Sequence, residues 1–135
     1  MACADSEPAM FVSMNRPTTD DLQGAIPPIT SLISKSEKAQ LKLTPGTWQH
    51  TMLRENLRAL HLALALLKRT NGAAVCSRED LRAALRAFAA MTGRSEQAQA
   101  KFAPGSSQHT LQRNRIRAFR TADAVIRAEL NDSNA

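Results

Sequence analysis

The chain has 135 residues, of which 43% are apolar, and a formal net charge of +6 at pH 7. This length suits one domain with a modest hydrophobic core, and a count of only two cysteines excludes a disulfide scaffold. An aromatic content of 4%, with no tyrosine, argues against a platform of stacked aromatic side chains that would bind bases.

The first 17 residues, MACADSEPAMFVSMNRP, are predicted to form a disordered leader. They have no basic segment followed by a long apolar run, so they do not resemble a secretory signal, and no later segment has the length of uncharged apolar sequence that a membrane span needs. Cys3 and Cys76 do not form a CxxC pair. We therefore expect a cytoplasmic protein without membrane contact.

Positive charge is concentrated after the first quarter of the chain. Residues 1–33 hold Asp5, Glu7, Asp20 and Asp21 against the single cation Arg16, a balance of −3, which leaves +9 on the remainder. A basic body favours polyanionic partners through long-range attraction, although arginines that only solvate helix faces would give the same balance.

A stretch of 32 residues recurs 59 positions later in the chain. Residues 36–67 and 95–126 align without a gap and share 15 identities, including the motif Pro-Gly-x-x-Gln-His-Thr at residues 45–51 and 104–110. A weaker match extends upstream. The sequence therefore predicts two homologous units, residues 18–76 and 77–135, that form one domain.

Each unit is predicted to be a helical hairpin. Apolar or small residues recur at alternating spacings of three and four in the first half of both units, which is typical of one helix face. The two series are Leu22, Ala25, Ile29, Leu32, Ser36, Ala39 and Leu43, and Leu81, Ala84, Phe88, Met91, Ser95, Ala98 and Phe102. Pro27 and Pro28 should kink the first helix of unit one or delay its start to about residue 27.

Pro-Gly then interrupts each unit, and Thr47 or Ser106 can cap a second helix that ends near residue 69 or 131. Two such hairpins joined by a polar linker at residues 68–77 predict an all-α, up-down four-helix bundle, with both Pro-Gly turns at the same end. Fusion of the two subunits of an ancestral homodimer would also produce such a duplication. The sequence is compatible with a homo-oligomer as well. An alternative interpretation makes residues 39–43 and 98–102 short strands, as in ribbon-helix-helix proteins. We rank it second because these segments are rich in residues that favour helices.

Several polar residues recur in both units and lie at equal distances from the turn. Glu37 is thereby predicted to pair with Arg54, and Glu96 with Arg113, as exposed ion pairs that fix the register of each hairpin. A structural role in these ion pairs would explain why the four residues recur, without any role in binding.

The remaining recurrent polar residues suggest a binding site. Arg113, Arg117 and Arg120 form a cationic stripe on the last helix, and Arg58 is the counterpart of Arg117 in unit one. If the two turns share an end, the recurrent side chains Lys42, Lys101, His50 and His109 together with helix N-termini could bind phosphate there. Packing at the turn explains the histidines equally well, and two histidines without further ligands do not make a zinc site.

The sequence contains no nucleophile elbow, phosphate-binding glycine loop, HExxH or catalytic carboxylate pair. We therefore expect a non-enzymatic helical binding protein without a cofactor or metal. DNA or RNA bound through the arginine-rich face is the first expected partner, and a protein bound at a bundle face or at the Pro-Gly end is the alternative.

Overall fold

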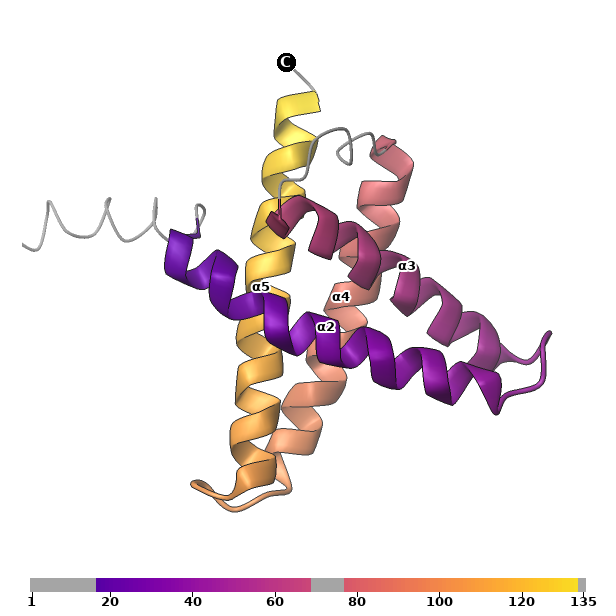
Figure 1. Ribbon diagram of the computed structural model, residues 1–135, viewed down its shortest axis with the longest axis vertical. Coiled ribbons are helices and arrows are strands. Elements are labelled where there is room, and N and C mark those ends of the chain that lie inside the picture. Colours follow the sequence, from indigo (N-terminus) through magenta and orange to yellow (C-terminus); the bar gives the residue numbers. More distant parts are fainter. Residues whose placement is uncertain (1–16, 69–76, 134–135) are drawn as a thin grey trace, which may run out of the picture.

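The computed structural model describes residues 17–68 and 77–133, which form four helices and no strand (Figure 1). The helices are α2 (Thr19–Leu41), α3 (Trp48–Lys68), α4 (Arg78–Ala100) and α5 (Ser107–Ser133). The predicted all-α four-helix bundle is confirmed. The ribbon-helix-helix alternative is wrong, because residues 39–41 and 98–100 complete the helices α2 and α4. All but the last residue of the predicted leader, and most of the predicted linker, lie outside the described residues.

The first helix of each hairpin begins at a capping hydroxyl. Thr18 accepts a hydrogen bond from the backbone N–H of Asp21 at 3.0 Å, and the Asp21 carboxylate accepts one from the Thr18 N–H, also at 3.0 Å. Ser77 caps α4 through the backbone N–H of Asp80 at 3.0 Å. Each hydroxyl satisfies one of the backbone donors that a helix N-terminus leaves free.

Pro27 and Pro28 lie inside α2 instead of at its start, so the predicted delayed start is wrong. The carbonyls that lose their helical donors are those of Gln23 and Gly24, four residues earlier. Both of those residues are exposed, so water can hydrogen-bond to the carbonyls. The reciprocal Thr18 and Asp21 bonds stabilise the turns that precede the prolines.

The two hairpin turns have the same local structure at positions 59 apart. The C-cap residues Lys42 and Lys101 each donate a backbone bond to the carbonyl three residues earlier, at 3.1 Å. Gly46 and Gly105 have φ values of +94° and +88°, in a region that favours glycine. The recurrence of Pro-Gly is thus explained by a turn that needs a positive φ at its glycine.

The two hairpins cross each other, as Figure 1 shows: the α2–α3 turn and the α4–α5 turn project from the molecule in different directions. Contacts join α2 to α5, α3 to α4 and α3 to α5, in addition to the contacts within each hairpin. The expectation that both Pro-Gly turns lie at one end is therefore wrong. Equal loops do not determine the angle at which two hairpins pack against each other.

The core lies where the hairpins cross. All four helices contribute to it, and its fully buried large side chains are Ile29, Leu60, Leu66, Leu81, Phe88 and Ile126. The rings of Phe88 and Phe119 contact each other with centroids 5.7 Å apart. Toward the turns the predicted apolar stripes come out of the core: Ala39 is exposed, and 37% of Phe102 is accessible.

The hairpin ion pairs are shifted by seven residues from those predicted. Glu37 contacts His61 (3.7 Å), and Glu96 contacts Arg120 (3.3 Å), instead of Arg54 and Arg113. The two observed pairs occupy equivalent positions in the two hairpins. The prediction assumed that residues equidistant from Pro-Gly lie opposite each other. A shift of seven residues is about two helical turns and keeps the partner on the same side of its helix, so the pattern located the face correctly but not the position along the helix axis.

Candidate functional site

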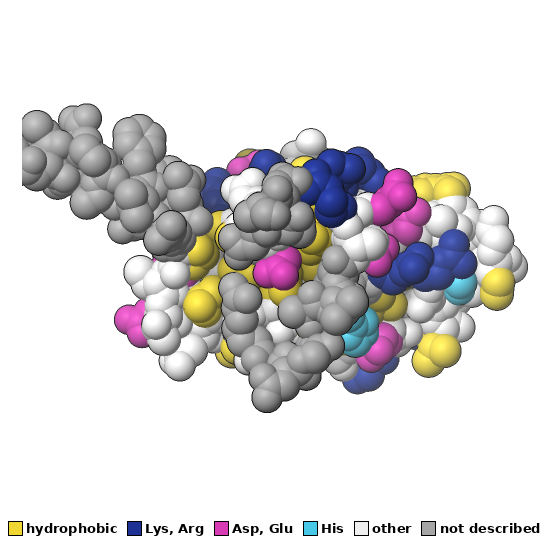
Figure 2. Space-filling model, turned by 90° about the horizontal axis from the view of Figure 1, so that it is seen from above, with side chains coloured by type: hydrophobic (Ala, Val, Ile, Leu, Met, Phe, Trp, Pro, Cys, Tyr) yellow, Lys and Arg dark blue, Asp and Glu magenta, His cyan; other side chains and the backbone are white. Residues whose placement is uncertain are grey.

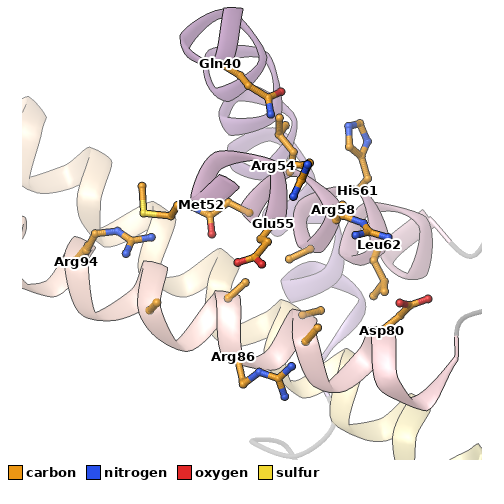
Figure 3. Close-up of a pocket in the computed structure, with 17 residues that line it drawn as sticks. Gln40, Met52, Arg54, Glu55, Arg58, His61, Leu62, Asp80, Arg86 and Arg94 are labelled. Atoms are coloured by element: carbon orange, nitrogen blue, oxygen red, sulfur yellow. The ribbon is translucent and has the colours of Figure 1, made fainter. Parts of the chain in front are cut away.

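A groove of about 730 Å³ lies between α3 and α4 (Figure 3). We call it the α3–α4 groove. Alanines from both helices, among them Ala59 and Ala84, keep the helices close and the lining shallow. Its charged lining residues are the arginines Arg54, Arg58, Arg86 and Arg94, against the carboxylates Glu55 and Asp80. The lining is therefore rich in positive charge.

The arginines reach this groove because of helical spacing. Arg54, Arg58 and His61 follow at i, i+4 and i+7 on α3, so they share one side of that helix. Figure 3 shows Arg94 at one end of the groove beside Met52, and Asp80 at the other end beside Leu62. The cationic side chains thus extend along the groove instead of clustering at one point.

The four groove arginines are exposed, and none of them forms an ion pair within the part of the chain that the structure describes. Their hydrogen-bonding groups are available to an external anion. Guanidinium groups suit phosphate in particular, because their planar donor arrangement can bind two oxygens at once.

A second groove, of about 430 Å³, lies between α2 and α5, and we call it the α2–α5 groove. It occupies the equivalent position in the fold: Asp21, Ala25, Arg117 and Ala118 stand here 59 residues from Asp80, Ala84, Arg58 and Ala59. Its charged lining residues are Asp20, Asp21 and Arg117, one cation against two carboxylates. The two grooves therefore differ in the sign of their charge.

The predicted stripe on α5 is divided between different environments. Arg120 is paired with Glu96, whereas Arg113 and Arg117 are exposed and form no ion pair among the described residues. Arg117 lines the α2–α5 groove together with two aspartates. The neighbouring Arg115 is half-buried, and its burial lowers the pKa of the guanidinium from its usual range. The stripe is not one free cationic surface.

The predicted site at a shared bundle end is not assembled. His50 and Lys42 lie at the α2–α3 turn, and His109 and Lys101 at the α4–α5 turn, which Figure 1 places apart. Both histidines occupy capping positions, since their backbone N–H groups donate to the hydroxyls of Thr47 (3.3 Å) and Ser106 (3.2 Å). These bonds involve the backbone and not the imidazole rings, so they explain the recurrence of Thr47 and Ser106 as capping residues but not that of the histidines.

Arg86 and Arg94, which also line the α3–α4 groove, were not among the site residues predicted from the sequence. Their spacing of eight residues places them two turns apart on one side of α4, a signal that was present in the sequence. Their counterparts 59 residues earlier are Pro27 and Lys35, so a search for recurrent residues passes over them. Arg54 was assigned only to an ion pair and not to binding.

No group of three His, Cys, Asp or Glu side chains lies close enough to hold a metal ion within residues 17–68 and 77–133. None of the helices described has the length and apolar character that a membrane crossing requires. No family model, curated protein or solved structure matches the chain.

Proposed function

We propose that this protein is a non-catalytic nucleic-acid-binding protein that holds the phosphate backbone in the α3–α4 groove. The observation that carries the proposal is that four exposed arginines from two helices line one groove, none of them in an ion pair among the described residues. Arg58 was among the residues predicted from the sequence; Arg54, Arg86 and Arg94 join it.

Charge and shape together suit the groove to a polyanion. An isolated exposed arginine is usually only solvated, but several aligned along a groove bind successive charges of a polyanion and release its counterions. The net charge of +6 attracts such a ligand over a longer range. The alanine-rich lining lets a backbone approach without displacing large side chains.

The test compares two sets of arginine substitutions. Replacing Arg54, Arg58, Arg86 and Arg94 by glutamine should weaken binding to unrelated sequences about equally. It should also reduce the steepness of the log affinity against log salt plot by about 0.7 to 0.9 for each lost contact. Fluorescence anisotropy of a labelled oligonucleotide over a salt series measures both quantities.

The control is the α5 stripe, with Arg113, Arg117 and Arg120 replaced by glutamine. This variant loses nearly the same charge but leaves the α3–α4 groove intact, so its salt dependence should change less. Equal losses in the two variants would show that only overall charge matters and would contradict a groove site. Failure of the folded wild-type protein to bind DNA or RNA at low salt would end the proposal.

A second candidate function is a protein-interaction adaptor that uses the Pro-Gly end of the first hairpin. The observation that favours it is the exposure of two large apolar side chains there, Leu41 (87% accessible) and Trp48 (70%). Figure 2 shows hydrophobic side chains at the surface of that end of the molecule. Crosslinking in cells followed by mass spectrometry, compared between the wild type and a Leu41→Ser, Trp48→Ser variant, tests this function.

A further inference from the structure

Trp48 is a large aromatic side chain outside the lining of the α3–α4 groove. It is the first residue of α3, and 70% of its surface is accessible. Its counterpart in the second hairpin is Ser107, which occupies the same helix start. The hairpin fold therefore does not need a large aromatic side chain at this position.

Helical geometry places Trp48 at the end of the α3–α4 groove. At about 100° per residue, Trp48 lies within about 20° of Glu55 and Ala59 around the α3 axis, and within about 40° of Met52. All three of those residues line the groove. Trp48 is not itself one of the residues that line the groove, but it stands on this side of α3 one helical turn before Met52, beyond the end where Figure 3 shows Met52 and Arg94.

We infer that the ligand of the α3–α4 groove is a single-stranded nucleic acid, with one unpaired base stacked on Trp48. The inference rests on the proposed function and specifies its ligand. Arginines along the groove bind successive phosphates, and the indole supplies the flat apolar surface that a base requires. In a duplex, neighbouring base pairs cover the faces of each base, so Trp48 distinguishes single strands from double strands.

The dimensions agree with a short site. The side of α3 from Trp48 to Leu62 is about 21 Å long at 1.5 Å per residue. At about 3.4 Å for each stacked nucleotide, this length holds about six nucleotides. An oligodeoxythymidylate of about ten nucleotides is therefore long enough as a probe and has no tendency to pair with itself.

The chain contains one tryptophan and no tyrosine, so its intrinsic fluorescence excited near 295 nm comes from Trp48 alone. Titration with the oligodeoxythymidylate should quench this emission, whereas a hairpin duplex of equal charge should leave it nearly unchanged. Replacing Trp48 by alanine should weaken binding of the single strand about 5- to 150-fold and leave duplex affinity unchanged. Replacement by phenylalanine should restore part of the loss.

The matched control is Leu41→Ala, which removes the other exposed apolar side chain of the same turn. It should leave single-strand affinity unchanged; an equal loss in Leu41→Ala and Trp48→Ala would indicate a general apolar contact and overturn the stacking. Groove-dependent binding without quenching, or with unchanged affinity in Trp48→Ala, would overturn this inference while leaving the proposed function in place. Absence of binding to any nucleic acid would overturn both. Circular dichroism establishes that each variant is folded.

Discussion

The α3–α4 groove and the α2–α5 groove occupy equivalent positions in the two halves of the fold, but different residues form their surfaces. The equivalent alanines Ala25 and Ala84 are buried in both, whereas the rims differ: Arg86 of the first groove stands where Pro27 stands in the second. Burial constrains the residues beneath both grooves, but it does not constrain their rims. The difference between the rims is therefore where a functional difference between the two halves can reside.

The shared core gives the largest expected effects. Leu60 and Phe119 occupy equivalent buried positions, with 1% and 2% of their surfaces accessible. Leu60→Ala should lower the free energy of unfolding by about 2–5 kcal/mol, and Phe119→Ala by about 3–5 kcal/mol, because each leaves a cavity in the same core. Urea denaturation followed by circular dichroism should show one transition in both variants. Two separate transitions would mean that the hairpins are independent units.

The hairpin turns should respond alike in both halves. Gly46→Ala and Gly105→Ala should each lower the free energy of unfolding by about 1–2 kcal/mol, because alanine is strained at these positive φ values although space is free around both. Gly24→Ala, in the helix α2 with open space around it, should instead raise stability by about 0.5–1 kcal/mol. Thermal unfolding measures all three. A neutral result at the turn glycines would remove the explanation for the recurrent Pro-Gly.

Substitutions of the equivalent aspartates Asp21 and Asp80 should affect different properties: the stability of the fold for Asp21, and nucleic-acid binding for Asp80. Asp21→Ala removes the carboxylate that accepts the Thr18 N–H, and should lower the free energy of unfolding by about 0.5–1 kcal/mol more than Asp80→Ala. Asp80→Ala removes a negative charge from the α3–α4 groove, and should strengthen nucleic-acid binding about two- to fivefold. Stronger nucleic-acid binding in Asp21→Ala, and not in Asp80→Ala, would place the binding site in the α2–α5 groove.

The exposed ion pairs give the smallest effects. A double-mutant cycle between Glu96 and Arg120 should give a coupling of about 0.2–1 kcal/mol, since both side chains are more than half exposed. The same cycle between Glu96 and Arg113 should give no measurable coupling, because these residues form no pair. Coupling in the second cycle but not in the first would restore the register predicted from the sequence.

Helices, turns and core were predictable because they depend on local or periodic signals: capping hydroxyls, Pro-Gly, and apolar residues at helical spacing. The hairpin crossing was not, because the sequence pattern of one hairpin does not encode the angle at which it meets the other. The candidate site depends on that crossing. Arg58 was predicted from the sequence, but that it shares a groove with Arg86 and Arg94 depends on α3 packing against α4, and the exposure of Trp48 depends on the turn lying beyond the core.

The central claim is that the α3–α4 groove binds nucleic acid and the α2–α5 groove does not. The most direct measurement is a titration of the isotopically labelled protein with the oligodeoxythymidylate, followed by amide and arginine side-chain NMR shifts. We predict that the largest shifts lie at Trp48, Arg54, Arg58, Arg86 and Arg94, with small shifts at Asp21 and Arg117. Shifts that are largest along α5 and α2, or equal in the two grooves, would contradict the account.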